Sequence, residues 1–234
     1  MAVERIGVVG LGAMGAGIAQ VAIEAGFEVV GREVTTELGE AAAGRIGHFL
    51  TRKVEKGQRT QDERDAAVAR LTTTSELSKL SECDLVIEAI VEELDAKRAL
   101  FAELERICRT DAVLATNTSA LSVTEIAAAT ATPERVVGMH FFNPAPLMPL
   151  VEVVRAQLSA DEAVAAALAI VERLGKVAVP CHDTPGFVVN RVLIPLLNDC
   201  VRVLDEARVT PEGDRKSTRL NSSHSLTSRM PSSA

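Results

Sequence analysis

The chain has 234 residues, of which 47% are hydrophobic and 24% are charged, and its formal net charge is −7. Such a composition suits one globular domain of ordinary size with the start of a second. The negative charge and the lack of Trp and Tyr argue against a nucleic-acid partner, which favours a basic face and stacking aromatic side chains.

Short apolar runs alternate with helical patterns along most of the chain. We predict strands at residues 5–9, 28–30, 85–89, 112–116, 136–141, 150–154 and 177–179. We predict helices at residues 16–25, 35–56, 94–107, 122–129 and 159–174. The last two helices begin with the S-x-x-E pattern of a capping box, at Ser122 and Ser159. The alternation predicts an α/β fold with a Rossmann-type, doubly wound, mostly parallel sheet.

The pattern changes twice towards the C-terminus. Residues 1–184 are predicted to form the Rossmann-type domain, and residues 185–213 the start of a truncated all-α second domain whose first helix runs through Asp205. Residues 214–234 are rich in serine and show no periodicity, which predicts disorder. They also resemble a translated sequencing-library adapter, so we expect the natural protein to continue beyond Gly213. A genuine disordered tail is the alternative.

A glycine-rich turn follows the first predicted strand. The dinucleotide-binding pattern G-x-G-x-x-G is formed by Gly10, Leu11, Gly12, Ala13, Met14 and Gly15. The first glycine allows a tight turn, the second lets a pyrophosphate approach the backbone, and the third lets the helix pack closely on the strand. A merely structural turn is the alternative.

The residues after the second strand bear on the choice of cofactor. Glu33 stands where a carboxylate accepts the ribose hydroxyls of NAD and repels the 2′-phosphate of NADP. Arg32 beside it would instead favour that phosphate. We predict NAD, with NADP and a solvated strand end as the alternatives.

A polar residue ends one apolar run and another lies inside the next. If the strands that carry His140 and Glu152 lie side by side, the carboxylate can hold the imidazole. A histidine held in this way can take a proton from an alcohol and return it, which suits reversible oxidation of a hydroxyl. A buried structural histidine is the alternative.

Other classes of site find no support in the sequence. The cysteines stand far apart, without CxxC or Cys/His spacing, so we predict reduced thiols and no metal. No signal peptide precedes the first strand, and every long apolar run is interrupted too early to span a bilayer. We therefore predict a cytoplasmic protein with no membrane partner.

Five stretches between residues 6 and 191 resemble the 3-hydroxyacyl-CoA dehydrogenase family, and within it the bacterial 3-hydroxybutyryl-CoA dehydrogenases. They read VGLGAMGAGIAQ, LVIEAIVEELDAK, ATNTSALSVTEIA, GMHFFNPAPLMPLVEVV and DTPGFVVNR, in the family's order and spacing. The resemblance implies reversible, NAD-dependent oxidation of an (S)-3-hydroxyacyl-CoA, such as 3-hydroxybutyryl-CoA, to the 3-ketoacyl-CoA in fatty-acid or butanoate metabolism. It also implies a homodimer formed through the helical domain.

The resemblance assigns roles to particular residues. His140 would be the catalytic base and Glu152 its orienting partner, and both Ser119 and Asn190 would hydrogen-bond the substrate oxygen. The nicotinamide-ribose end of the cofactor would be lined by Ser119, Glu92, Lys97 and Asn143. The CoA phosphates would contact the basic stretch of the long helix, Arg52, Lys53 and Lys56, of which Lys56 matches best.

Each role has a simpler alternative. Glu92 and Lys97 could be a helix-start acid and an exposed lysine, and the basic stretch a solvated helical face. Ser119 and Asn143 could cap turns, and Asn190 could be a surface amide. The chain also departs from the family at two places. Pro149 replaces a basic residue that many members carry, which concerns the CoA contacts, and Gly31-Arg32 replaces an apolar pair, which concerns the cofactor choice.

Two other functions stay open at this point. A CoA-independent 3-hydroxy acid dehydrogenase also opens with G-L-G-x-M-G, although such enzymes use a lysine-centred site in place of HFFNP. A nucleotide-binding protein without turnover is the second. For the chain without its helical domain, we expect weak cofactor binding and little activity.

Overall fold

The computed structural model describes residues 3–206. These residues fall into two compact units, one ending at Val188 and the other beginning at Val189. The predicted tail at 214–234 and the last residues of the segment 185–213 lie outside the described part of the chain. We describe each unit by itself.

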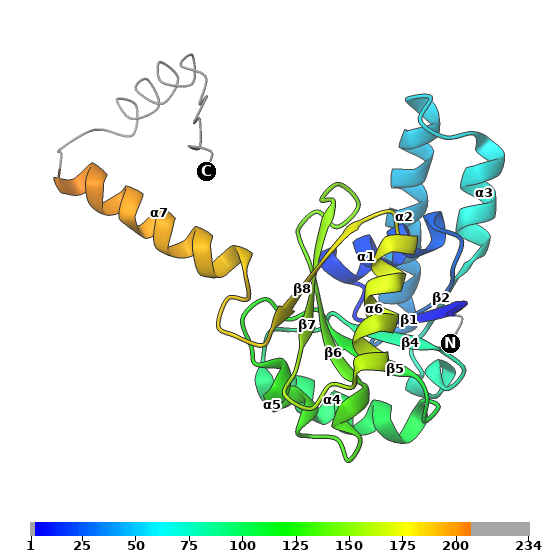
Figure 1. The fold of residues 1–234 in the computed structure, drawn as a ribbon. Coiled ribbons are helices and arrows are strands. Elements are labelled where there is room, and N and C mark those ends of the chain that lie inside the picture. Colours follow the sequence, from blue (N-terminus) through cyan, green and yellow to red (C-terminus); the bar gives the residue numbers. More distant parts are fainter. Residues whose placement is uncertain (1–2, 207–234) are drawn as a thin grey trace, which may run out of the picture. The chain divides into compact units, whose positions relative to one another are not determined.

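The first unit alternates strands and helices (Figure 1). Its strands are β1 (Arg5–Val9), β2 (Glu28–Arg32), β3 (Leu71–Thr74), β4 (Leu85–Glu88), β5 (Val113–Thr116), β6 (Val136–Phe141), β7 (Leu150–Arg155) and β8 (Val177–His182). Its α-helices are α1 (Ala13–Glu24), α2 (Thr36–Glu55), α3 (Gln61–Ala69), α4 (Leu94–Ile107), α5 (Val123–Ala127) and α6 (Asp161–Arg173). Short 3₁₀ turns are η1 (Leu77–Leu80) and η2 (Pro133–Arg135).

All the strands belong to a single sheet in the order β3-β2-β1-β4-β5-β6-β7-β8. Every neighbouring pair is parallel except β6 and β7. The chain returns directly from β6 to β7 through residues 142–149, and so short a link, with no crossover helix, permits only antiparallel pairing. The predicted mostly parallel, doubly wound sheet is confirmed.

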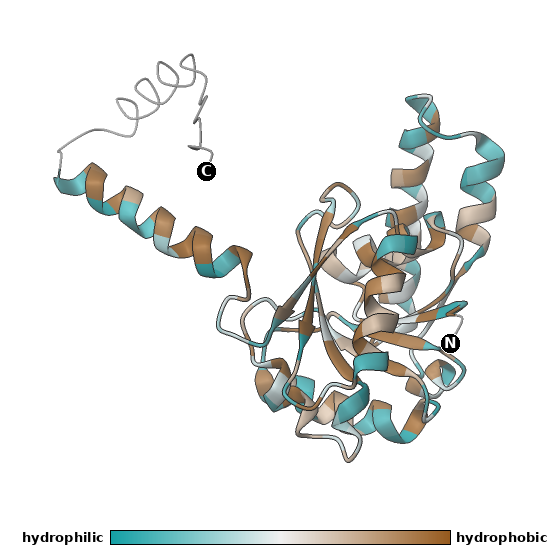
Figure 2. Cartoon of the chain, viewed as in Figure 1, coloured by the Kyte–Doolittle hydropathy of each residue, from teal (hydrophilic) through white to brown (hydrophobic). Residues whose placement is uncertain are grey.

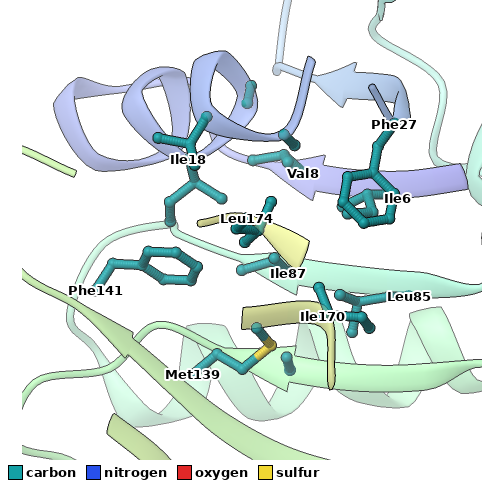
Figure 3. Packing of buried hydrophobic residues seen from close by; sticks show 14 of the residues in the cluster. Ile6, Val8, Ile18, Phe27, Leu85, Ile87, Met139, Phe141, Ile170 and Leu174 are labelled. Carbon is teal, nitrogen blue, oxygen red and sulfur yellow. The ribbon is translucent and has the colours of Figure 1, made fainter. Parts of the chain in front are cut away.

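Alternate side chains of the strands pack on opposite faces of the sheet. Ile6 and Val8 of β1 join a buried cluster with α1, α2 and α6, whereas Val9 joins a second cluster with α4 and α5. Figure 3 shows the first cluster, where Ile18 and Ile170 lie against the strands. Burial on both faces explains why the central strands read as continuous apolar runs.

The structure corrects several sequence-based expectations. The predicted capping box at Ser159 is wrong, because α6 begins after Ala160 without a side-chain cap. The Ser159 hydroxyl donates instead to the carbonyl of Val136 at 2.5 Å. Helix α5 is shorter than predicted, and α3 and β3 were not predicted. A true capping box opens α3, where Thr60 and Glu63 bond each other's backbone amides.

The second unit begins with helix α7 (Val189–Glu206). One side of this helix is apolar, and the colours of Figure 2 alternate along it accordingly. Its exposed apolar side chains are Val192, Leu193, Ile194, Leu196, Leu197, Val201 and Val203. Within residues 3–206, no helix combines the length and the apolar character that crossing a bilayer requires.

Candidate active site

The glycine turn lies at the carboxyl end of β1, beside the point where the strand order reverses between β1 and β4. Gly10 has a φ of +86°, and a Cβ there would stand 2.7 Å from the carbonyl oxygen of Ala89. A Cβ at Gly15 would stand 1.7 Å from the carbonyl oxygen of Gly10, so α1 packs directly on the turn. At Gly12 a Cβ would meet nothing within 4 Å. The turn therefore leaves open space at its centre, where the α1 amides begin, which fits a pyrophosphate.

Glu33 is bound to the same turn from the end of β2. Its Oε1 accepts the amide of Leu11 at 2.6 Å and its Oε2 accepts the amide of Val34 at 3.0 Å. Arg32 donates from Nε to the carbonyl of Ser75 at 3.4 Å. A carboxylate beside an open glycine turn is the arrangement that a dinucleotide ribose requires. The residues present therefore fit a dinucleotide cofactor.

The departure at Gly31 also has a structural reason. A Cβ at Gly31 would stand 2.7 Å from Cδ1 of Leu11, whose side chain is fully buried. Because Gly31 on β2 has no side chain, the Leu11 side chain of the glycine turn can pack against it. This exchange keeps the Leu11 amide within reach of Glu33.

His140 and Glu152 face each other across β6 and β7, as predicted. They are register partners in the antiparallel pair, and Nδ1 of His140 lies 2.7 Å from Oε2 of Glu152. Both side chains are buried, with exposed fractions of 7% and 0%. An ionised carboxylate only accepts hydrogen bonds, so with such a partner Nδ1 is the donor, and in that neutral tautomer Nε2 carries the free lone pair.

The surroundings of the pair hold both side chains in place. The second oxygen of Glu152, Oε1, accepts the amide of Val188 at 3.0 Å. The His140 ring packs against Phe142 and Phe187, with centroid distances of 4.5 and 5.6 Å. Phe187 has a φ of +49°, an uncommon value for a bulky residue. Such backbone outliers cluster at functional sites, where the surrounding contacts hold them.

Glu92 organises the loop that carries Ser119, directly after β5. Its Oε1 accepts hydrogen bonds from the Thr118 hydroxyl, from the amides of Ser119 and Ala120, and from the Ser119 hydroxyl. Partial burial alone would raise the pKa of Glu92, but the hydrogen bonds from Thr118 and Ser119 and the charge of Lys97 together lower it. Glu92 therefore stays ionised and holds the Ser119 loop.

Lys97 is buried beneath Glu92, so the alternative of an exposed helix lysine is wrong. Its Nζ lies 2.6 Å from Oε1 of Glu88 and 3.2 Å from Oε2 of Glu92. Glu88 is fully buried and also accepts the Thr116 hydroxyl at 2.7 Å. A buried ion pair of this kind needs such additional hydrogen bonds to offset the loss of hydration. The network joins β4, β5 and α4 to the Ser119 loop.

Two residues that sequence reasoning did not single out connect distant parts of the site. Asp183 accepts the Ser122 hydroxyl at 2.7 Å and the amides of Val123 and Thr124 at the start of α5. Asn117 accepts the amide of Phe141 at 2.9 Å and so joins the Ser119 loop to the end of β6. Asp183 stands in the DTPGFVVNR stretch and Asn117 in ATNTSALSVTEIA, which were the available signals. Glu88 interrupts an apolar strand, which was the signal for the buried ion pair.

A cavity of about 580 Å³ lies between α1, α2 and residues 144–147. Three residues of the predicted basic stretch line it, but they are not equivalent. Lys53 is paired with Glu24 at 2.6 Å, whereas Arg52 and Lys56 make no ion pair with any residue between 3 and 206. The basic stretch therefore offers this cavity two available cations for an anionic ligand.

The loop after β6 forms one wall of this cavity, and a lysine side chain binds its backbone. The Nζ of Lys176 donates to the carbonyls of Ala145 and Met148, each at 2.7 Å. Burial lowers the pKa of Lys176 from its ordinary value. This side chain therefore orders the loop between the catalytic strands.

The remaining predicted residues are placed as follows. Asn143 is exposed in the loop after β6 and precedes Pro144 through a cis peptide bond. Asn190 lies at the start of α7, in the second unit. In the described part of the chain, no group of three His, Cys, Asp or Glu side chains could hold a metal ion.

Comparison with protein families gives a match over most of the chain. The model described as "3-hydroxyacyl-CoA dehydrogenase, NAD binding domain" matches residues 5–184. This range contains the glycine turn, the Ser119 loop and the His140–Glu152 pair.

Curated proteins and solved structures give the same result. The chain is 42% identical to a probable 3-hydroxybutyryl-CoA dehydrogenase of Bacillus subtilis, over 97% of this chain and 79% of that protein. It is 46% identical to the 3-hydroxybutyryl-CoA dehydrogenase of Mycobacterium tuberculosis, over 96% of this chain and 79% of that protein. The crystal structure of (S)-3-hydroxybutyryl-CoA dehydrogenase from Ralstonia eutropha superposes with a TM-score of 0.88 at 36% identity, covering 90% of this chain and 75% of that one.

Proposed function

The chain belongs to the 3-hydroxyacyl-CoA dehydrogenase family, and on that premise we propose that it catalyses the reversible, NAD-dependent oxidation of (S)-3-hydroxybutyryl-CoA to acetoacetyl-CoA. The observation that carries this proposal is the buried contact of 2.7 Å between His140 and Glu152. It supports the proposal because a neutral ring that donates from Nδ1 to Glu152 presents an unprotonated Nε2, the state that a general base requires.

In the proposed mechanism, Nε2 of His140 takes the proton of the C3 hydroxyl as the C3–H bond breaks. A dinucleotide held by the glycine turn and Glu33 would supply the acceptor for the hydride that leaves C3. Glu152 keeps the imidazole in its Nδ1-protonated form and stabilises the imidazolium that results. In the reverse direction, His140 returns the proton to the carbonyl oxygen while hydride adds to C3.

Ser119 and Asn190 are proposed to hydrogen-bond the substrate oxygen. Donors that are already in place stabilise the charge that develops on this oxygen. The contacts of Glu92 with both the hydroxyl and the amide of Ser119 support a fixed position for that hydroxyl. Glu92, Asn143 and Lys97 are proposed to form the nicotinamide-ribose end, with Lys97 acting through Glu92.

NAD is proposed as the cofactor in preference to NADP. The carboxylate of Glu33 is bound to the Leu11 amide of the glycine turn, where it would accept ribose hydroxyls and repel a 2′-phosphate. The hydrogen bond from Arg32 to Ser75 supports the same choice, because it engages the one arginine adjacent to that carboxylate.

The CoA phosphates are proposed to bind in the cavity beside α2. Lys56 and Arg52 supply positive charge that no carboxylate between residues 3 and 206 neutralises. Lys53 is bound to Glu24 and contributes less than the other two. The substitution at Pro149 leaves this part of the proposal intact, since Arg52 lies on α2 and Lys56 directly follows it.

We also propose a cytoplasmic homodimer. The exposed apolar side of α7 supports an assembly in which a helical domain buries this surface. Sedimentation at micromolar protein concentration would distinguish such a dimer from a monomer.

The test of the proposed function is turnover. NADH oxidation with acetoacetyl-CoA is followed for the 234-residue chain and for an extended chain, in which the C-terminal part of the Bacillus subtilis relative follows residue 206. We expect the extended chain to oxidise NADH with acetoacetyl-CoA and to be inactive with free acetoacetate. Activity with free acetoacetate would favour a CoA-independent dehydrogenase, and cofactor binding without turnover in either chain would favour a binding protein.

A further inference from the structure

Arg45 stands between the cofactor turn and the cavity proposed for CoA. It projects from α2, about two turns before Arg52, and lines the same cavity as Arg52 and Lys56. Its Nη2 donates to the carbonyl of Leu11 at 3.0 Å. A single side chain thus contacts the glycine turn and borders the neighbouring ligand cavity.

Leu11 is held on three sides in this turn. Its amide donates to Oε1 of Glu33 at 2.6 Å, and its carbonyl accepts from Arg45. Its side chain fills the space left by Gly31 and is fully buried. A change in the Arg45 contact therefore acts on the Leu11–Gly12 peptide, which leads into the open space at Gly12 and directly follows the amide that binds Glu33.

The guanidinium of Arg45 has capacity for a second partner. A guanidinium presents five N–H donors, and the Leu11 carbonyl uses one of those of Arg45. The others make no hydrogen bond to any residue within 3–206. The planar arrangement of these donors matches the oxygens of a phosphate, and a single lysine ammonium cannot reproduce it.

We propose that Arg45 couples the two binding sites, so that a CoA phosphate in the cavity strengthens dinucleotide binding at the glycine turn. This inference rests on the proposed function. A phosphate that binds the free donors of Arg45 immobilises the guanidinium while it still holds the Leu11 carbonyl. The entropy of ordering this side chain and the turn is then lost once for both ligands, which produces positive cooperativity without a larger conformational change. By linkage, the cofactor strengthens CoA binding by the same factor.

The experiment measures the dissociation constant of NADH from the 234-residue chain by fluorescence, with and without saturating coenzyme A. Coenzyme A is used because it lacks a reducible acyl group. We expect coenzyme A to lower the NADH dissociation constant about fivefold, the lower end of ordinary allosteric coupling. In Arg45→Ala, the ratio of the NADH dissociation constants without and with coenzyme A should be about 1, within the error of a typical titration.

Two further variants separate coupling from charge and from folding. Arg45→Lys retains the positive charge but not the fork of donors, so we expect it to bind both ligands and to lose most of the coupling. Arg52→Ala is the matched control, because Arg52 lines the same cavity on the same helix and, among residues 3–206, makes no hydrogen bond to Leu11. This variant should bind coenzyme A more weakly. At saturating coenzyme A, its NADH dissociation constant should still fall about fivefold, as expected from typical coupling energies.

The outcomes distinguish this inference from the proposed function. If both ligands bind the wild-type chain without affecting each other, or if Arg45→Lys keeps the full ratio, the coupling role is refuted and the proposed function stands. Competition between NADH and coenzyme A also refutes it, since it would place both ligands in one site. If the wild-type chain binds neither ligand, the inference is refuted for this chain, and turnover of the extended chain decides the proposed function separately.

Discussion

The glycine turn and the catalytic pair are built from contacts of different range. The turn spans Gly10 to Gly15, and its tightest approach, between Gly15 and the carbonyl of Gly10, lies within the turn itself, although Gly10 also packs against the carbonyl of Ala89. The pair joins side chains 12 residues apart in sequence, and Glu152 is also bound to the amide of Val188, 36 residues further on. The first region is therefore encoded locally, whereas the second depends on strand pairing.

This difference determines how each region can fail. A methyl group at the wrong glycine collides inside the turn, whatever the rest of the sheet does. The catalytic pair instead requires the correct register between β6 and β7, because a slip of one residue would turn Glu152 to the opposite face of the sheet. The following predictions test the two regions against each other.

The largest effect is expected at the catalytic pair. His140→Gln keeps a hydrogen-bonding side chain of similar length beside Glu152 but removes the base. We expect turnover of the extended chain to fall about a thousandfold, within the usual range for a general acid–base residue, while NADH affinity stays unchanged. Glu152→Gln should lower turnover by a smaller factor, because the base His140 is still present. Undiminished turnover in His140→Gln would contradict the assignment.

The next effect separates two glycines of the same turn. Gly15→Ala places a Cβ 1.7 Å from the Gly10 carbonyl oxygen, so we expect it to lower the free energy of unfolding by about 3 kcal/mol. Gly12→Ala meets nothing within 4 Å and should fold normally. It should nevertheless weaken NADH binding about tenfold, because its methyl group occupies the space expected for the pyrophosphate. Urea unfolding and NADH titration test both variants, and equal stability of the two would show that the turn tolerates a closer contact.

A smaller effect is expected at the ribose carboxylate. Glu33→Gln removes the charge but keeps an acceptor for the Leu11 amide. NADH affinity should fall about fivefold, or roughly 1 kcal/mol, and NADPH affinity should rise because the repulsion of the 2′-phosphate is removed. Titration of both cofactors measures the change. A wild-type chain that prefers NADPH would overturn the cofactor proposal.

The smallest effect concerns the contact between the DTPGF segment and α5. Asp183→Ala should lower the free energy of unfolding by about 1 kcal/mol at pH 7, the usual cost of losing a helix N-cap acceptor. Burial raises the pKa of Asp183, but the hydrogen bonds from Thr124, Ser122 and Val123 outweigh it and lower the pKa below its ordinary value of 3.8. Its stabilising effect is therefore complete above that value and is lost as the pH falls through the lowered pKa.

The pH dependence supplies the control for that variant. The difference in unfolding free energy between wild type and Asp183→Ala should shrink below pH 3.8. Asp183→Asn still accepts a hydrogen bond at every pH, so its difference from Asp183→Ala should stay constant. Chemical denaturation at several pH values tests this, and a difference between wild type and Asp183→Ala that persists at low pH would exclude the carboxylate as its source.

Much of the site could be predicted from residues that are close in sequence. The positions of Gly10 and Gly15 follow from backbone geometry, and the place of Glu33 follows from the spacing after the turn. The contact between His140 and Glu152 could be predicted once the two strands were assumed to be neighbours. The capping box predicted at Ser159 failed, because a hydrogen bond to the distant Val136 carbonyl competes for that hydroxyl.

The sequence by itself determined the α/β alternation, the glycine turn and the chemical types of the site residues, because these follow from local backbone preferences and periodicity. Only the tertiary structure decided which charges remain available. Lys53 is paired with Glu24 and Lys97 with Glu88, while Arg45 reaches the Leu11 carbonyl. Such pairings join residues that are distant along the chain, so they depend on the order and register of the strands that bring them together.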